Sequence, residues 1–340
     1  MSRHVLITGG AGYIGSMLVG ALLRRGEWVT VADNLLFGGG SLLPYLADPA
    51  FRFLREDVCR PGLLDRVEQA SQSSGAPPLS AIVHLAAIVG FPACQVADRD
   101  VVWKTNVDAV QRIFDEANTH GVERFTLAST YSVYGVAEDD KPVTEEAELR
   151  PQSLYAETKI AAESSLRQAA HQSDCAPLIL RFATLYGVSP RTRFDLLVNQ
   201  FVLEAFSQGE LLIYEGDNSR SFVHIQDVIT GLLMGLDAPI EKTRGQVFNL
   251  GHPDGNSTKD EIVALVCKAL PNTQVRRKNM HLDGDMRDVR VSYEKIEKEL
   301  GFSAQRDIPD GIDEVLFLLR SGLIADPYHP AYRNAPPIVA

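Results

Sequence analysis

A glycine-rich turn near the start of the chain restricts the fold more than any other feature of the sequence. The apolar run Val5–Ile7 leads into glycines at positions 9, 12 and 15, and a helical pattern follows. Gly9 allows a tight turn, Gly12 lets the backbone approach phosphate oxygens, and Gly15 lets the new helix pack closely. An anion would then rest on the free N–H groups and the positive dipole end of that helix. The segment therefore predicts a pyrophosphate site, although a glycine triplet by itself also occurs in ordinary turns.

The second predicted strand carries an acidic residue at its end. Trp28–Ala32 is apolar and is followed by Asp33, about 20 residues beyond the glycine-rich turn, as in dinucleotide-binding βαβ units. A carboxylate there accepts hydrogen bonds from the adenosine ribose hydroxyls and repels a 2′-phosphate. A strand end can also carry an acidic residue that only faces solvent, but here turn, helix and acid occur together. The pattern therefore predicts NAD, in preference to NADP, as the cofactor.

Four more apolar runs alternate with helical patterns, which predicts an α/β fold with a doubly wound parallel sheet of the Rossmann type. These runs are Phe51–Leu54, Ala81–Leu85, Arg124–Ala128 and Leu178–Phe182. Asp57 and Val58 follow the first run and would meet the adenine. The stretch Leu85–Ala87 follows the second run, where small side chains would let the backbone lie along the cofactor.

The alternation becomes irregular after about residue 183, where glycine, proline and charged residues are more frequent. We therefore predict an NAD-binding Rossmann domain over residues 1–183 and a smaller mixed substrate domain over residues 184–325. Ser221–Ile225 is expected to return to the large sheet, so that residues 219–235 would belong to the first domain. The proline-rich tail, residues 326–340, is expected to be extended and has no assigned chemistry.

Composition excludes several classes of function. The 33 basic and 44 acidic residues give a net charge of -11, which argues against non-specific binding to nucleic acid or anionic membranes. The four cysteines form no CxxC pair and are expected to be reduced, and no cluster of His, Cys and Asp has metal-ligand spacing. No secretory signal precedes the first strand, and no apolar run reaches transmembrane length. These features predict a cytoplasmic protein without a metal.

A tyrosine and a lysine between the fifth and sixth predicted strands carry the catalytic signal. Tyr155 and Lys159 lie four positions apart in a segment that favours helix, so both side chains would share one face. A phenol titrates at about 10, so proton transfer at neutral pH needs a shift of about 3 units. The ammonium of Lys159 favours the phenolate, and it could also hold the nicotinamide ribose. Thr130, at the end of the fifth strand, could hydrogen-bond the substrate oxygen.

The same spacing also arises by chance from a half-buried tyrosine and a solvated lysine, so the pair depends on the upstream cofactor pattern. The predicted catalytic residues are Thr130, Tyr155 and Lys159. The predicted cofactor-binding residues are Gly9, Gly12, Tyr13, Ile14, Gly15, Asp33, Asn34, Asp57, Val58, Leu85, Ala86, Ala87, Tyr155 and Lys159.

The chain resembles the extended short-chain dehydrogenases/reductases, in the group of NAD-dependent nucleotide-sugar epimerases and dehydratases. The resemblance covers almost the whole chain and rests on the TGGAGYIG loop, Asp33, Asp57, the HLAA stretch at 84–87, Asn106, Thr130, the YxxxK pair and residues 181–187, 220–227 and 285–288. It implies hydride exchange between NAD and a sugar carbon, on a substrate held by its nucleoside diphosphate. It also implies a homodimer, in which the helix of Tyr155 and Lys159 pairs with the helix after Asn106.

The resemblance further implies which residues would hold the substrate. Arg220 and Arg287 occupy the positions of the group's diphosphate-binding arginines, and Arg191 and Arg193 lie on a loop that could also face phosphates. A guanidinium suits this task because its fork binds phosphate oxygens in pairs. Each arginine could instead be a solvated surface charge. The hypothesis that they bind the substrate therefore requires the four side chains to converge on one cleft. Thr184 stands where 4-epimerases often have an asparagine that touches the diphosphate, which argues against the usual galactose-type substrate.

Departures from the group's pattern narrow the reaction. The 4,6-dehydratases carry Asp-Glu, the acid and base that expel water, where this chain has Tyr131-Ser132, and the decarboxylases tend to have Glu at the position of Ser132. We therefore predict a nucleotide-sugar epimerase that acts at C4 through a transient 4-keto sugar. The alternatives are a 4-keto-sugar reductase with the same three catalytic residues, a 4,6-dehydratase, and a non-catalytic cofactor-binding sensor, which would not need these residues. The base, the sugar and the stereocentre stay open.

Overall fold

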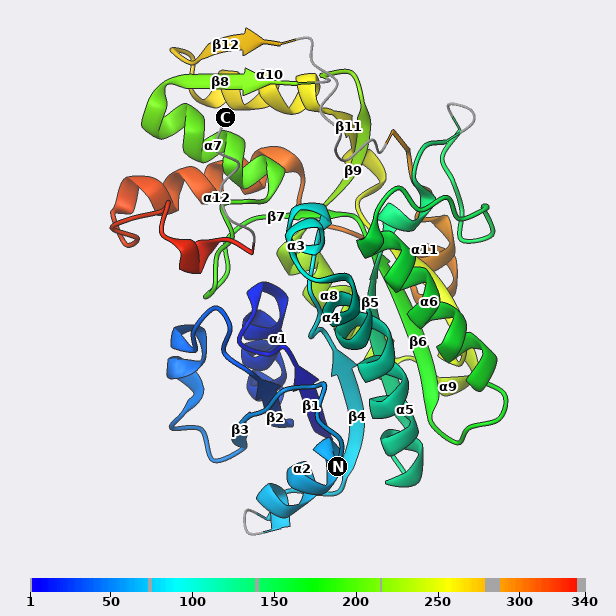
Figure 1. The fold of residues 1–340 in the computed structure, drawn as a ribbon. Helices are drawn as coiled ribbons and strands as arrows, with labels where there is room; N and C mark the ends of the chain where they lie inside the picture. The colour runs from blue at the N-terminus through cyan, green and yellow to red at the C-terminus, as the bar shows by residue number, and fades with distance from the viewer. Residues whose placement is uncertain (1, 73–74, 138–140, 215, 279–287, 335–340) are drawn as a thin grey trace.

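The computed structural model describes residues 2–72, 75–137, 141–214, 216–278 and 288–334, and a seven-stranded parallel sheet forms its centre (Figure 1). The strands are β1 (His4–Thr8), β2 (Trp28–Asp33), β3 (Phe51–Arg55), β4 (Leu79–His84), β5 (Arg124–Thr130), β6 (Ala176–Phe182) and β10 (Gln246–Leu250). Their order in the sheet is β10-β6-β5-β4-β1-β2-β3, so the chain starts in the middle and reverses direction between β1 and β4. This arrangement confirms the doubly wound α/β fold, in which ligands bind beyond the carboxyl ends of the strands at the reversal.

Helices cover both faces of this sheet because successive strand side chains point to opposite sides. In β1, Val5 and Ile7 lie in one buried cluster with α1 and α8, whereas Leu6 lies in a second cluster with α2, α5 and α6. These helices are α1 (Tyr13–Arg24), α2 (Leu63–Gln72), α5 (Ala109–Thr119), α6 (Leu154–Ala169) and α8 (Ile225–Asp237). Shorter helical segments are η1 (Gly40–Tyr45), α3 (Phe91–Val96), α4 (Arg99–Trp103), the π-helical η2 (Lys104–Asp108), η3 (Tyr131–Tyr134), α9 (Ile240–Thr243) and α11 (Glu294–Leu300).

A smaller mixed unit lies beyond the carboxyl ends of the strands, at the top of Figure 1. Its strands form two small sheets, β11-β9-β7 and β12-β8, with bounds β7 (Thr184–Tyr186), β8 (Glu210–Ile213), β9 (Ser219–His224), β11 (Asn256–Thr258) and β12 (Gln274–Arg277). Its helical segments are α7 (Leu197–Gln208), η4 (Pro253–Gly255), α10 (Lys259–Ala269), α12 (Ile308–Ser321) and η5 (Pro330–Tyr332). Phe194, Phe201 and Phe222 belong to its separate buried core. The predicted smaller mixed domain is therefore present.

One predicted strand joins a different sheet. The segment Ser221–Ile225 was expected to return to the large sheet, but β9 pairs with β7 and β11 of the small unit. Only the following helix, α8, returns to pack against α1. The seventh strand of the large sheet is instead β10, which pairs with β6 and was not predicted. Division of the chain at residues 183 and 325 stays a proposal.

The described part of the tail, residues 326–334, packs against the small unit. The ring centroids of Tyr332 and Phe194 lie 6.0 Å apart, and the Phe194 N–H donates to the Tyr332 carbonyl at 2.9 Å. A helical turn, η5, lies within this segment. Pro330–Tyr332 thus form a helical turn that packs against the small unit, and an extended tail over residues 326–340 as a whole stays a prediction.

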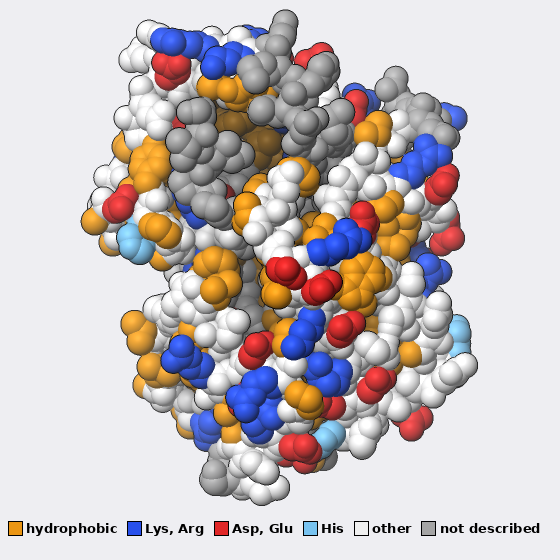
Figure 2. All heavy atoms as spheres, in the orientation of Figure 1, with side chains coloured by type: hydrophobic (Ala, Val, Ile, Leu, Met, Phe, Trp, Pro, Cys, Tyr) orange, Lys and Arg blue, Asp and Glu red, His pale blue; other side chains and the backbone are white. Residues whose placement is uncertain are grey.

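On the face shown in Figure 2, acidic and basic side chains alternate with hydrophobic ones and form no extended basic area among the described residues. Among the helices that the structure describes, none is long and apolar enough to cross a membrane.

Candidate active site

A cavity of about 590 Å³ lies between the two units, beyond the carboxyl ends of β1, β2, β4 and β5. Its size is typical of a small-molecule site. The predicted residues that line it are Gly9, Gly12, Tyr13, Ile14, Asp33, Asn34, Asp57, Val58, Leu85, Ala86, Ala87, Thr130, Tyr155, Lys159, Thr184, Arg191 and Arg193. Gly15 and Arg220 do not line the cavity, and Arg287 lies outside the described residues. The fold thus gathers residues from most of the chain into one site.

The glycine-rich turn fits a pyrophosphate because it leaves no room for side chains. A Cβ on Gly9 would lie 2.7 Å from the backbone nitrogen of Ala86, and the φ of Gly9 is +72°. A Cβ on Gly15 would lie 2.5 Å from the carbonyl oxygen of Gly9, so Gly15 lets α1 pack closely against the turn itself. Helix α1 follows Gly12 directly and has no side-chain cap. Its first N–H groups are therefore available to an anion.

Asp33 is held rigidly at the end of β2. Its carboxylate accepts hydrogen bonds from the backbone N–H of Ala11 at 3.0 Å and of Leu35 at 2.8 Å. Leu35 is in the left-handed region, with a φ of +62°, which turns the chain sharply after Asp33. Burial raises the pKa of Asp33, against the lowering effects of these two hydrogen bonds and of Arg191. The carboxylate is thus preorganised to accept a hydrogen bond from a ribose hydroxyl. The positive charge near it is the guanidinium of Arg191.

Tyr155 and Lys159 share one face of α6, as predicted. Helix α6 starts after Ser153, whose side chain accepts a hydrogen bond from the Ala156 N–H at 3.2 Å. The Lys159 Nζ lies 5.9 Å from the centroid of the Tyr155 ring and donates to the Ala128 carbonyl of β5 at 2.8 Å. Burial lowers the pKa of Lys159 to about 8, although Glu163 acts in the opposite direction. The pair therefore lies against the end of β5, and the Lys159 side chain changes its charge at a pH of about 8.

Hydroxyl groups surround this pair at the end of β5. Thr130 Oγ1 accepts from the Ser132 N–H at 3.1 Å and donates to Ser132 Oγ at 2.9 Å. The Tyr131 hydroxyl lies 2.9 Å from Thr184 Oγ1, which belongs to the small unit. Tyr131 and Ser132, the two positions that differ from the dehydratases, both line the cavity. Neither side chain can act as a carboxylic acid or a carboxylate base.

Two of the four predicted substrate arginines line the cavity in the described part of the chain. Arg193 pairs with Asp195 at 2.8 Å, and Arg191 lies over the Phe37 ring, 4.3 Å from its centroid. Arg220 is buried in β9 opposite Ser257 and does not line the cavity, so its predicted contact with the substrate lacks structural support. Among the described arginines, Arg191 and Arg193 thus converge on the cavity and Arg220 does not, whereas Arg287 lies outside the described residues.

Sequence reasoning missed several residues that line the cavity at the Asp33 end, namely Leu36, Phe37, Glu56 and Asn334. Phe37 follows Asp33 at short distance, and the glycines at 38–40 that come next were the available signal for a close-fitting loop. Asn334 lies in the proline-rich tail, where the sequence offers no periodicity and gives no such signal.

A buried ionic network lies beneath α6. Glu163, one turn after Lys159, accepts hydrogen bonds from Ser129 Oγ and from Arg181, whose Nη2 lies 2.7 Å from a carboxylate oxygen. Arg181 Nη1 also donates to the Tyr134 hydroxyl at 2.9 Å. The side chains of Arg181 and Glu163 are only 1% and 2% exposed. The network therefore ties α6 to β5, β6 and η3 behind the catalytic pair.

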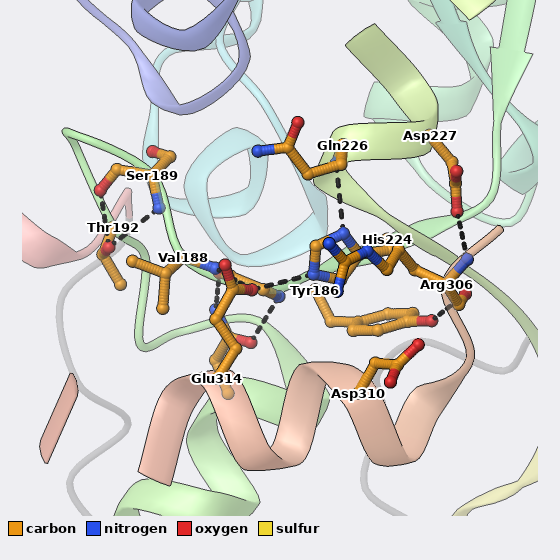
Figure 3. Close-up of polar contacts among 12 residues, drawn as sticks. Tyr186, Val188, Ser189, Thr192, His224, Gln226, Asp227, Arg306, Asp310 and Glu314 are labelled. Carbon is orange, nitrogen blue, oxygen red and sulfur yellow. Dashed lines mark hydrogen bonds and ion pairs between the residues drawn. The ribbon is translucent and has the colours of Figure 1, made fainter. Parts of the chain in front are cut away.

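A second polar network holds the loop between β7 and α7, which carries Arg191 and Arg193. Figure 3 shows Glu314 of α12 pointing toward His224 and the backbone of Val188. Its carboxylate lies 2.8 Å from His224 Nε2 and accepts from the Val188 N–H at 3.0 Å.

His84 at the end of β4 also has a partner within the fold. Its Nδ1 lies 2.9 Å from Thr8 Oγ1, and burial lowers the pKa of His84 to about 3. Both histidines thus make hydrogen bonds within the fold.

A dinucleotide-type turn, a strand-end aspartate and a Tyr-Lys pair in one cavity define an NAD-dependent enzyme of the short-chain dehydrogenase/reductase class. Residues 5–251 match the NAD dependent epimerase/dehydratase family, and the chain belongs to this family. The predicted family and the NAD cofactor are thereby confirmed.

Relatives in this family differ in the reactions that their names give. The chain is 32% identical over 329 residues to a dTDP-glucose 4,6-dehydratase of Streptomyces griseus, with 92% of each chain covered. It is 28% identical to a UDP-glucose 4-epimerase of Corynebacterium glutamicum, over 97% of this chain and 99% of the relative. The structure of MoeE5 in complex with UDP-glucuronic acid and NAD is similar, with a TM-score of 0.78, 27% identity and coverage of 94% and 99%. The chain is thus an NAD-dependent enzyme whose full-length relatives modify nucleotide sugars.

Proposed function

We propose that this protein is a nucleotide-sugar epimerase that inverts C4 through a transient 4-keto sugar. The observation that carries the proposal is the lining of the cavity around Tyr155. Thr130, Tyr155 and Lys159 lie there with the hydroxyl side chains of Tyr131 and Ser132. These groups suit proton transfer at a sugar hydroxyl, and they include no carboxylate.

Each catalytic residue has a task that its surroundings support. Tyr155 would remove the proton of the C4 hydroxyl and later return it, with Thr130 hydrogen-bonded to the same oxygen. The buried ammonium of Lys159 favours the phenolate form of Tyr155, because opposite charges attract strongly away from water. NAD, when bound, supplies the oxidising chemistry at C4 by accepting a hydride and returning it to the sugar. The keto sugar must turn over within the cavity before this return, so that the other face of C4 is presented.

Dehydration is disfavoured because elimination needs an acid and a base near C5 and C6. Among the described residues that line the cavity, the carboxylates are Asp33, Glu56 and Asp57. All three follow or end β2 and β3, on the side of the sheet where the dinucleotide fingerprint puts adenosine. Several relatives are dehydratases by name, but Tyr131 and Ser132 cannot replace the Asp-Glu pair that the dehydratases carry.

The substrate would enter from the small unit. We assign Arg193 and Thr184 to the nucleotide diphosphate because both line the cavity on that side. Arg220 and Arg287 stay candidates for the same task on the basis of the family resemblance. A homodimer and a cytoplasmic location also stay predictions.

Hydrogen and redox balance test the reaction. Candidate UDP- and dTDP-hexoses with deuterium at C4 would be incubated with the protein and a catalytic amount of NAD, with Tyr155→Phe protein as the control. We expect an isomer of unchanged mass that keeps all its C4 deuterium, with no net change in NADH. A product that is lighter by one water would contradict the proposal in favour of a 4,6-dehydratase. Conversion only of 4-keto sugars, with one NADH consumed per product, would identify a reductase.

A further inference from the structure

The loop of the small unit reaches the adenosine side of the cavity through Arg191. The guanidinium of Arg191 lies over the ring of Phe37, which belongs to the loop after β2. Asp33, the predicted ribose ligand, ends the same strand and lies close enough that each of the two charges shifts the pKa of the other. Arg191 therefore faces the cofactor half of the cavity, whereas the family resemblance had suggested the substrate diphosphate.

The tail of the chain fixes the guanidinium in this position. Arg191 Nη1 donates to Asn334 Oδ1 at 2.5 Å, and Nη2 donates to the Arg333 carbonyl at 2.9 Å. The Asn334 N–H donates in turn to Asp195 at 3.0 Å. Arg191 and Asn334 both line the cavity. The tail and the loop after β2 thus both contact one arginine.

Of the five N–H donors of the Arg191 guanidinium, the one on Nε is buried without a partner among the described residues. Arg191 as a whole is only 6% exposed. A buried N–H of a charged group that lacks an acceptor is unfavourable. Because Arg191 lines the cavity, we expect this donor to turn toward a ligand oxygen when a ligand binds. The adenosine half of a dinucleotide offers such oxygens in its ribose and phosphates.

The loop that carries Arg191 is itself well supported. Thr192 Oγ1 donates to the Ser189 carbonyl at 2.7 Å, and Glu314 holds the Val188 N–H (Figure 3). On the other side, the Tyr13 hydroxyl of α1 donates to the Gly187 carbonyl at 2.8 Å. The loop is therefore anchored both to α12 of the small unit and to the first helix of the cofactor site.

We propose that Arg191 is a cofactor-binding residue, whose Nε donates a hydrogen bond to an oxygen of the adenosine half of NAD while Phe37, Arg191 and Asn334 close over that half. The tail then slows the release of NAD and keeps the cofactor in the protein from one turnover to the next. This inference rests on the NAD dependence of the family and is independent of the reaction at C4.

Binding measurements with two kinds of probe test the assignment. ADP-ribose and NADH report on the cofactor site, whereas UDP and dTDP report on the substrate nucleotide site. We expect Arg191→Ala to weaken ADP-ribose binding about 10- to 100-fold, as loss of a charged hydrogen bond does, and to speed NADH release in stopped-flow displacement. Binding of UDP or dTDP should stay unchanged. Unchanged ADP-ribose affinity, or a loss confined to UDP and dTDP, would overturn the proposal.

Variants in the tail separate the contact from a general loss of structure. Asn334→Ala removes the hydrogen bond to Arg191 and should also speed NADH release, by a smaller factor. Arg333→Ala is the matched control, because the hydrogen bond from Arg191 ends on the Arg333 backbone carbonyl, which this substitution keeps. The rate of NADH release from this variant should equal that of the wild type. Thermal melting shows whether each variant is folded. Equal release rates for wild-type and Asn334→Ala protein would exclude the role of the tail.

Discussion

At the residue scale, the proposed chemistry requires a buried phenol to ionise, and a neighbouring positive charge favours this ionisation. Tyr155 is almost buried, at 9% exposed, so water contributes little to stabilising its phenolate. Lys159 lies one turn away and keeps its own position through the Ala128 carbonyl. Because the acceptor is a backbone carbonyl, this hydrogen bond holds the ammonium near Tyr155 without neutralising its charge.

Tyr155→Phe should therefore remove most turnover and leave NAD affinity nearly intact. Loss of a proton-transfer group reduces turnover by about 100- to 10,000-fold, and the ring itself stays in place. Steady-state kinetics measure turnover, with the nucleotide sugar that the deuterium experiment identifies as the substrate. Calorimetry measures the affinity for NAD. Tyr45→Phe is a suitable control because Tyr45 does not line the cavity. Wild-type turnover in the Phe variant would show that Tyr155 is not the acid/base.

The pH dependence should show the ionisation of Lys159. The pKa of Lys159 in the folded protein is about 8, below the ordinary 10.5, so the ammonium is lost as the pH rises through about 8. We expect kcat/KM to fall along an alkaline limb in this region.

The stability of the protein should also depend on the ionisation of Lys159. Between the two pKa values the unfolded chain binds more protons than the folded protein, so the free energy of unfolding should rise with pH there. Lys159→Met should flatten this rise, as measured by denaturant titrations at several pH values. An unchanged slope of the unfolding free energy against pH would contradict the lowered pKa of Lys159.

Asp33 should set the preference for NAD over NADP. The Asp33→Ala variant removes the ribose acceptor and the negative charge near a 2′-phosphate, while Arg191 stays in place. The ratio of NAD affinity to NADP affinity should therefore fall by about 10-fold. Calorimetry with both cofactors measures the ratio. Asp57→Asn also removes a carboxylate from the cavity and should leave the ratio unchanged. Equal wild-type affinities for NAD and NADP would exclude the role of Asp33.

At the scale of elements, the position of α6 depends on a buried ion pair. Glu163 and Arg181 connect α6 to β6, and Ser129 of β5 donates to the same carboxylate. A buried pair of this kind is costly to break because the remaining charge loses its partner. The network thus fixes the helix that carries the catalytic pair against the strands that carry Thr130 and Ala128.

Removal of either charge should destabilise the protein strongly. Arg181→Met or Glu163→Gln should each lower the free energy of unfolding by about 3–5 kcal/mol, whereas the double variant should lose less than the sum. Urea titrations measure the coupling. Glu163→Gln should also shift the alkaline limb of kcat/KM to lower pH, because Glu163 raises the pKa of Lys159. Additive losses and an unshifted limb would contradict the role of the network.

At the scale of the whole molecule, assembly into a homodimer stays a prediction. Apolar side chains are exposed on α3 and α4, next to α6: Val96 is 71% exposed, Val101 is 52% exposed and Trp103 is 36% exposed. Exposed apolar groups beside the helices that the family resemblance assigns to the interface are what a dimer would cover.

Sedimentation equilibrium should give twice the 37.3 kDa of one chain. Trp103→Glu should weaken the dimer because it puts a charge into the proposed interface. Phe317→Glu on α12, whose side chain is 74% exposed in the other unit, is the control and should leave the mass unchanged. A wild-type monomer at all concentrations would refute the prediction.

The local pattern of the sequence determined the first six strands of the large sheet, the glycine-rich turn and the common face of Tyr155 and Lys159. Each depends on short-range requirements: side chains alternate along a strand, a turn at Gly9 needs a positive φ, and residues four apart in a helix are neighbours. These requirements can be read from a few consecutive residues.

Only the tertiary structure decided which sheet received Ser219–His224 and which received Gln246–Leu250. Both strands are mostly buried, so their residues look alike in sequence, and the choice depends on which edge the chain reaches after α7 and α8. The position of Arg191 was decided in the same way. Its neighbours Phe37 and Asn334 lie more than a hundred residues away in opposite directions along the chain. No local pattern encodes such a meeting, because it arises from the packing of two units and a tail.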